Sequence, residues 1–184
     1  MSTKQLTERA LEHALKELMK IHPINKITVK MITDYCGVTR HTFYNHFSDI
    51  YELLGSLFEH EVIEDLEKCC HVSYWKQGIY LVLQYTLDNK TVCLNTFRSL
   101  GREHLEIFLY KTFRKMLDGV IDSIDKEQKA NSTHKVEVAD FFSYAVVGQF
   151  LAWLNDGLRE KPEVIADRIG RMLEGTISRL ILSK

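Results

Sequence analysis

The segment GVTRHTFYNHF, residues 37–47, carries many hydrogen-bonding side chains around only two large apolar ones, Phe43 and Phe47. In an α-helix, which turns by about 100° per residue, these two phenylalanines lie about 40° apart on one face. The opposite face then presents guanidinium, imidazole, hydroxyl and amide groups. Such groups can exchange hydrogen bonds with the base edges of DNA in the major groove.

Each of these residue types has a preferred partner on DNA. Arginine can read guanine through two hydrogen bonds, asparagine can read adenine, and the threonine methyl group can contact thymine. Neighbouring hydroxyl and ammonium groups can hold phosphates and fix the docking register. The residues expected to contact DNA are Thr28, Lys30, Thr39, Arg40, His41, Thr42, Tyr44, Asn45 and His46.

A polar helix face is also typical of an ordinary solvated surface, and helix-turn-helix geometry occurs in proteins that bind no DNA. The segment by itself therefore leaves both interpretations open.

Two helices are predicted ahead of this segment. Residues 3–21 carry apolar side chains at spacings of three and four, which indicates an amphipathic helix. Pro23 ends it, because the residue before a proline avoids the helical conformation. Thr28 is a suitable N-cap for a short helix over residues 29–36, and Gly37 suits the turn that follows.

The segment itself is predicted to form the third helix, capped by Thr39 and running to about residue 46. Ser48 is expected to cap a much longer fourth helix that continues to about residue 70. Two short helices joined by a tight turn form a compact unit, in which the second helix can enter the major groove while the first braces the DNA backbone.

The rest of the chain also reads as helical, and no stretch predicts a strand. The polar stretch KEQKANSTHK, residues 126–135, is expected to be a solvated connection. We therefore predict an all-α fold of about nine helices, with a helix-turn-helix head at residues 1–48 (motif about 28–47) and a larger helical domain at residues 49–184. The later helices are expected at residues 74–88, 91–100, 103–126, 136–158 and 162–182.

The composition fits a folded globular protein, with 45% hydrophobic and 27% charged residues in a chain of 184. The sequence contains neither an apolar run long enough to span a membrane nor a secretory signal, so we expect a cytoplasmic protein with no membrane contact.

The first 50 residues hold seven Lys or Arg against five Asp or Glu, a slight basic excess. In the cytoplasm the four cysteines are expected to be reduced. They are Cys36, Cys69, Cys70 and Cys93.

No residue pattern indicates catalysis or a metal. Cys69-Cys70-His71 has no second pair at zinc spacing, and HEVIE, residues 60–64, lacks the second histidine of a metalloprotease helix. A glycine-rich phosphate loop is missing as well. We therefore predict no enzymatic activity, no catalytic residue, no metal site and no cofactor.

The order of these features resembles the N-terminal domain of TetR-family transcriptional regulators over about residues 5–60. The segment FSDIYEL, residues 47–53, further resembles the branch of dihydroxyacetone-kinase regulators. The positions that carry the family resemblance are Thr28, Gly37-Val38, Thr39, Phe43-Tyr44, His46-Phe47 and Leu53-Leu54.

The resemblance implies a homodimeric, DNA-binding transcriptional regulator, a repressor or an activator. The two copies would join through the last two helices, including Phe150 and Leu173, and bind double-stranded DNA at a palindromic operator. A small-molecule or protein effector bound in the C-terminal domain would modulate operator affinity. The residues considered for ligand contact, each of which could instead belong to an ordinary core, are Trp75, Phe97, Arg98, Arg102, His104, Phe108 and Tyr144.

One position departs from the family pattern. The family commonly has a phosphate-gripping lysine near the start of the fourth helix, where this chain has Ile50, and the neighbouring Asp49 adds negative charge. The alternative function is therefore a co-regulator that keeps the fold, binds DNA weakly and acts through a partner protein.

Overall fold

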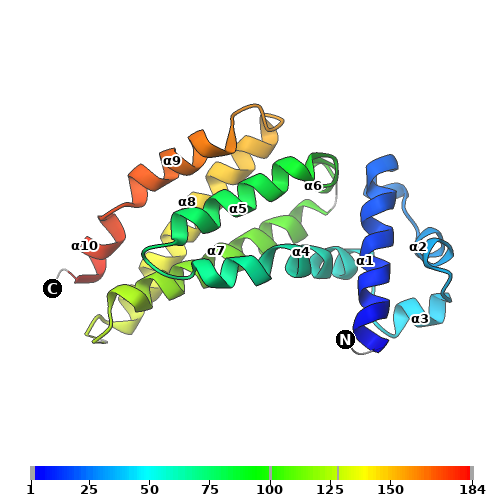
Figure 1. Cartoon of the computed structure of the whole chain (residues 1–184), viewed down its shortest axis with the longest axis horizontal. Coiled ribbons are helices and arrows are strands. Elements are labelled where there is room, and N and C mark those ends of the chain that lie inside the picture. The colour runs from blue at the N-terminus through cyan, green and yellow to red at the C-terminus, as the bar shows by residue number, and fades with distance from the viewer. Residues whose placement is uncertain (1–2, 100, 128, 183–184) are drawn as a thin grey trace. The chain divides into compact units, whose positions relative to one another are not determined.

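The computed structural model describes residues 3–99, 101–127 and 129–182, and within these ranges the chain is helical with no strand (Figure 1). The predicted all-α fold class is confirmed. The α-helices are α1 (Thr3–Ile21), α2 (Val29–Cys36), α3 (Arg40–Tyr44), α4 (Ile50–Leu66), α5 (Trp75–Asp88), α6 (Lys90–Phe97), α7 (Arg102–Ile124), α8 (Ser132–Asn155), α9 (Pro162–Leu173) and α10 (Thr176–Leu182). Two short 3₁₀ helices, η1 (Ile24–Lys26) and η2 (Glu67–Cys69), follow α1 and α4.

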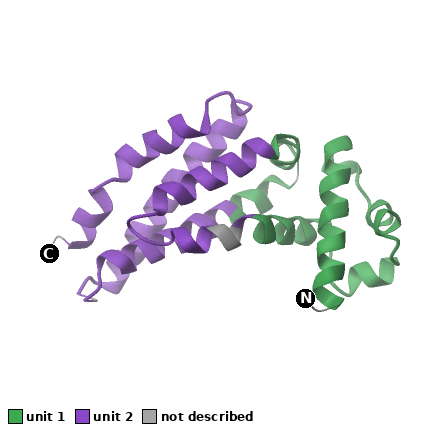
Figure 2. Cartoon of the chain, in the orientation of Figure 1, with its two compact units in different colours: residues 1–61, 89–108 green, residues 62–88, 109–184 purple. Residues whose placement is uncertain are grey.

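The chain divides into two compact units (Figure 2). Unit 1 comprises residues 1–61 and 89–108, and unit 2 comprises residues 62–88 and 109–184. The helix-turn-helix segment therefore belongs to a larger body that also contains α6. The functional boundary after residue 48 stays a prediction.

In unit 1, α1 packs against α2 and α6, and α2 packs against α3. Leu11 and Leu15 of α1 and Phe43 of α3 are completely buried. The helical period of apolar residues thus correctly predicted the burial of Leu11 and Phe43. At the ends of α1 the pattern is less accurate, since Leu6 and Ile21 are 55% and 75% exposed.

Two of the predicted helix caps are present. The hydroxyl of Thr28 accepts a hydrogen bond from the backbone N–H of Met31 at 3.3 Å, and that of Thr39 accepts one from Thr42 at 3.1 Å. Gly37 ends α2 in the left-handed region, with φ 68°. These local signals are therefore sufficient to define the turn between α2 and α3.

The predicted cap of α4 is wrong by one residue. Oδ1 of Asp49 accepts hydrogen bonds from the backbone N–H groups of Tyr51 and Glu52, each at 2.8 Å. The carboxylate of Glu52 accepts from the backbone N–H and the hydroxyl of Ser48, each at 2.6 Å. Asp49 is therefore the cap, and Ser48 supplies the reciprocal half of the capping arrangement.

In unit 2, α5 packs along α9 and α8 contacts α10. The range predicted as one last helix contains two, because Glu174 is extended and Gly175 has φ 72°.

The polar stretch predicted at residues 126–135 also ends earlier than predicted. Asn131 caps α8 by accepting hydrogen bonds from Thr133 and His134, so residues 132–135 are helical. Their polarity reflects a solvated first turn rather than a loop.

None of the helices within residues 3–99, 101–127 and 129–182 is both long and apolar enough to cross a membrane. None of the four cysteines forms a disulfide, and Cys69 and Cys93 are buried. Cys69 and Cys70 pack so closely on Gly78 and Gly119 that neither glycine has room for a Cβ atom. These two cysteines therefore serve the packing of α5 and α7 around η2.

Candidate nucleic-acid interface

The second helix of the motif, α3, is anchored by aromatic packing. Phe43 is fully buried, and its ring lies edge-on to Tyr44 with the centroids 5.4 Å apart. Phe47, 6% exposed, packs against Phe43 at 6.1 Å. A helix of five residues has little stability of its own, so these contacts hold its position.

The outer surface of α3 carries side chains without protein partners. Arg40, His41 and Asn45 are exposed, and no described residue forms a hydrogen bond or an ion pair with these side chains. Tyr44 is 51% exposed. Because these side chains have no hydrogen bond within the protein to break, they are suited to direct contact with base edges and phosphates.

The remaining residues of α2 and α3 combine a structural role with an outward position. The Thr39 and Thr42 hydroxyl oxygens lie 2.9 Å apart at the start of α3 and are hydrogen-bonded to each other. The Lys30 ammonium pairs with Asp34 at 2.5 Å, but both side chains are well exposed, at 75% and 62%. An ion pair so open to water is weak, and a phosphate could compete for the lysine.

The placement of His46 differs from the expectation. Its side chain is only 12% exposed, and its Nδ1 lies 3.2 Å from Oε1 of Glu8 on α1. It therefore connects the end of the motif to α1 instead of facing outward. This contact favours a positioning role for His46, and its contact with DNA stays a prediction.

Polar contacts also hold α4 against α1. Glu12, 2% exposed, accepts a hydrogen bond from the hydroxyl of Ser56 at 2.7 Å, and its Oε1 lies 2.5 Å from Nδ1 of His60. Lys16 reaches both carboxylate oxygens of Glu61 at 2.8 Å. The periodicity of α1 placed Glu12 outside the apolar face, so sequence reasoning missed this link. The partner lies more than 40 residues away, and no local signal indicates it.

Ile50 is the first residue of α4 and is partly exposed. The carboxylates of Asp49 and Glu52 share this turn, and the helix lacks a basic residue there. The backbone N–H groups of Tyr51 and Glu52 are already bonded to Asp49, so this turn offers a phosphate neither a cationic side chain nor these two donors.

The residues considered for ligand contact are distributed over both units. Trp75 and Tyr144 belong to unit 2, and Trp75 lines a cavity of about 310 Å³ with Val120 and Leu173. Tyr144 is 64% exposed and packs on Tyr110 at 4.7 Å. Both residues make these contacts within unit 2. Their role in effector binding stays a prediction.

The other five belong to unit 1. The Arg102 guanidinium lies 4.6 Å from the ring centroid of the buried Phe97, and His104 stacks in parallel on Tyr51 at 5.0 Å. Phe108 is buried against Phe58, whereas Arg98 is exposed at the end of α6. Their assignment to a ligand site also stays a prediction.

Across the described part of the chain, no group of three His, Cys, Asp or Glu residues is placed to hold a metal ion. This includes the segment Cys69-Cys70-His71, where the cysteines face the packing contacts described above.

Two family models match the chain. Residues 12–57 match "Bacterial regulatory proteins, tetR family", and residues 73–175 match "Transcriptional regulator C-terminal region", also a TetR model. The first match includes the whole α2–α3 motif, and the second covers more than half of the chain.

Relatives and solved structures agree with these matches. The HTH-type dhaKLM operon transcriptional activator DhaS of Lactococcus lactis subsp. lactis is 28% identical over 131 residues, which are 71% of this chain and 68% of that protein. The structure of the dihydroxyacetone kinase operon activator DhaS has a TM-score of 0.70 at 22% identity, covering 91% of this chain and 94% of that one. Both names fit the branch that residues 47–53 resemble.

A more distant structure has the same fold. NalD, the secondary repressor of the MexAB-OprM multidrug efflux pump in Pseudomonas aeruginosa, has a TM-score of 0.62 at 16% identity, with 91% of this chain and 94% of that chain covered. Together with the two family matches and the α2–α3 geometry, these findings identify the chain as a member of the TetR family of DNA-binding transcriptional regulators.

Proposed function

We propose that this regulator acts in the cytoplasm as a homodimer, binds a palindromic operator through α2 and α3, and changes its operator affinity when an effector binds. One observation carries the proposal. A short helix held by the buried Phe43 presents Arg40, His41 and Asn45 to solvent with no described protein partner.

The contacts divide by what they can recognise. Arg40, His41 and Asn45 would meet base edges, because they project from the exposed side of α3. Thr28 and Tyr44 would meet phosphates at either end of the motif, joined by Lys30 once it leaves Asp34. Thr39 and Thr42 lie at the start of α3, within reach of the same groove.

The dimer is supported by an exposed apolar surface in unit 2. On α8, Phe141 and Tyr144 are 68% and 64% exposed, and on α9, Val164 and Met172 are 48% and 68% exposed. The small residue Gly148 is also exposed on α8 and has open space beside it. A surface of this kind on a second copy is self-complementary, as a two-fold dimer requires.

Two residues expected at the dimer contact are placed elsewhere. Phe150 and Leu173 are 2% and 5% exposed within a single chain. They belong to the core of unit 2, because the helical stripe that contains them faces the neighbouring helices. The proposed interface is therefore the opposite side of α8 and the exposed residues of α9.

Fluorescence anisotropy with labelled duplexes tests the function. The full chain is titrated into a duplex from the region upstream of its own gene and into a shuffled duplex of equal length. We expect the upstream duplex to bind at least about a thousandfold more tightly at physiological salt. Equal affinity for both duplexes would contradict sequence-specific binding.

The acidic turn at the start of α4 favours a second candidate function. Ile50 stands where the family commonly carries a phosphate-gripping lysine, and the neighbouring carboxylates of Asp49 and Glu52 lower the attraction of this turn to DNA. A co-regulator that acts through a partner protein could function with this weaker binding to DNA. In that case both duplexes would bind weakly, and a partner protein would be needed to raise the affinity for the upstream duplex.

A further inference from the structure

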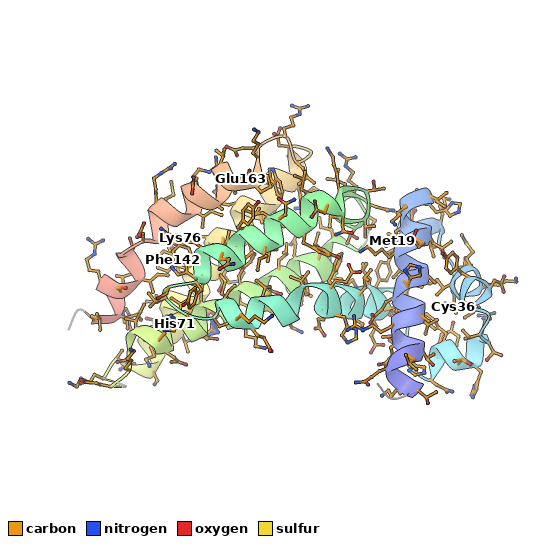
Figure 3. All side chains as sticks on the ribbon, viewed as in Figure 1. Met19, Cys36, His71, Lys76, Phe142 and Glu163 are labelled. Carbon is orange, nitrogen blue, oxygen red and sulfur yellow. The ribbon has the colours of Figure 1, made fainter. Side chains whose placement is uncertain are left out.

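A groove of about 520 Å³ runs along α6 in unit 1, beside the C-terminal end of α1. One face of α6 lines it throughout, since the lining positions 90, 91, 94, 95, 98 and 99 recur at helical spacing. The opposite wall is formed by the last residues of α1 and the turn into η1, including Met19 (labelled in Figure 3). The volume lies in the range of small-molecule sites.

The charges in this groove have one sign. Lys20, Lys90 and Arg98 line it beside the imidazole of His22, and none of its described lining residues is an Asp or a Glu. Lys20 is partly neutralised, because Glu17 pairs with it at 2.5 Å. Lys90 and Arg98 are exposed and form no ion pair with any described residue. A concave surface lined by cationic groups concentrates anions.

The positions of the cations limit the shape of a ligand. Lys90 and Arg98 stand at opposite ends of α6, about 12 Å apart along the helix axis at 1.5 Å per residue. Between them the groove presents the apolar side chains of Leu94 and Ile21. The groove is therefore basic at both ends and partly apolar in the middle.

We propose that this groove binds a small elongated organic anion with a phosphate or carboxylate group at each end and a short carbon chain between them. Arg98 would hold one anionic group, which its planar guanidinium can bind through two hydrogen bonds. Lys90 would hold the other. This identifies Arg98, among the residues considered for ligand contact, as a ligand-binding residue.

The groove lies on a hydrogen-bonded connection between α6 and α1. The Asn95 side-chain amide donates to the backbone carbonyls of Met19 at 2.9 Å and His22 at 2.8 Å, and its carbonyl accepts from the N–H of Ile24 at 2.9 Å. Asn95 thus fixes the turn that leads from α1 to the helix-turn-helix motif. A ligand bound along the same face of α6 would stabilise this connection, and its effect on operator affinity rests on the proposed function.

Isothermal titration calorimetry of the full chain without DNA tests the site. The probe is a hexane chain with a phosphonate at each end, compared with methylphosphonate at constant ionic strength. We expect saturable binding of the two-ended probe and at least about tenfold weaker binding of the one-ended probe, because only one cation is engaged. The double substitution Lys90→Gln and Arg98→Gln should weaken the two-ended probe by about tenfold or more.

The control is the double substitution Lys111→Gln and Lys126→Gln, which removes the same charge from exposed positions outside the groove. The control should bind like the unmodified chain. No saturable heat with the unmodified chain, or equal weakening by both double substitutions, would overturn the proposal.

A second measurement needs no substitution. In a ¹⁵N-labelled chain titrated with the two-ended probe, the amide shifts of Thr91, Asn95 and Ser99 should change together. Shifts confined to other parts of the chain would also overturn the site. A chain that binds the probe while failing to bind operator DNA would refute the proposed function and leave the groove intact.

Discussion

Nδ1 of His60 on α4 lies 2.5 Å from Oε1 of Glu12, a carboxylate of α1 that is 2% exposed. Ser56 donates to the same oxygen at 2.7 Å, so a single buried atom joins two turns of α4 to α1. A buried carboxylate is tolerated when hydrogen bonds replace its hydration.

Replacing Glu12 with alanine should therefore destabilise the chain by about 1–3 kcal/mol, since the buried hydrogen bonds are lost and a cavity is left. Urea denaturation followed by circular dichroism measures this change. The matched control is Glu17→Ala, whose side chain is 30% exposed and pairs with Lys20 on the same helix. It should alter the free energy of unfolding by less than about 0.5 kcal/mol. Equal effects at the two positions would refute the assigned role of Glu12.

Alanine at Arg40 or Asn45 should weaken binding to the matched operator by about 1–3 kcal/mol each and leave binding to shuffled DNA nearly unchanged. His46→Ala is the contrasting substitution. Because His46 contacts Glu8 inside unit 1, it should lower the melting temperature more than it alters base preference. Anisotropy titrations with single-base operator variants decide between the two roles, and equal losses on every duplex would exclude Arg40 and Asn45 as base readers.

Arginine at Tyr144 or Met172 should convert the dimer to monomers in sedimentation velocity, because two-fold symmetry brings each new charge to the interface twice. Ile107→Arg, at a 45% exposed position in unit 1, should leave the dimer intact. Phe150→Arg should instead unfold unit 2, since the side chain is 2% exposed. A monomeric unmodified chain at micromolar concentration would rule out the proposed interface.

Ile50→Lys tests the departure from the family pattern. If residue 50 faces the DNA backbone, the lysine adds one phosphate contact, and the slope of log K against log salt should steepen by about 0.9 on any duplex. The ratio of specific to non-specific affinity should hardly change. If the side chain instead contributes to packing, the salt slope should stay constant while the melting temperature falls.

The hydrogen bond to Asp140, together with desolvation, raises the pKa of Tyr110 to about 12. The folded chain therefore holds this proton above pH 10, where the unfolded chain releases it, so Tyr110 favours unfolding as the pH rises from about 10 to 12. Tyr110→Phe should flatten the loss of stability in that range. Ultraviolet titration of the folded protein should likewise show one fewer tyrosine ionising near pH 10 in the unmodified chain than in a variant with Asp140→Asn.

Sequence patterns predicted the parts of this molecule that depend on near neighbours. The caps at Thr28 and Thr39, the turn at Gly37 and the buried anchors Phe43 and Phe47 all follow from residue type and helical period within a few positions. The exposed polar face of α3 follows from the same period.

The features that sequence reasoning missed depend on distant partners. The burial of Glu12 is explained only by Ser56 and His60, and the inward position of His46 only by Glu8. The Asn95 side chain forms hydrogen bonds with three backbone groups that lie more than 70 residues earlier in the chain. The spacing of apolar residues along a helix does not indicate such polar contacts between distant residues, because a polar side chain at any of these positions could equally face solvent.

The hydrogen bonds of Asn95 to the end of α1 delay the folding of unit 1 while the chain is being translated. Unit 1 is not a continuous piece of the polypeptide, since it needs residues 89–108 in addition to residues 1–61. A nascent chain that has emerged only as far as α4 lacks the side chain that satisfies the Met19 and His22 carbonyls and the Ile24 amide. The DNA-binding half can therefore complete its fold only after α6 has left the ribosome, and an excised fragment of the first 48 residues should be less stable than the same residues in the whole chain.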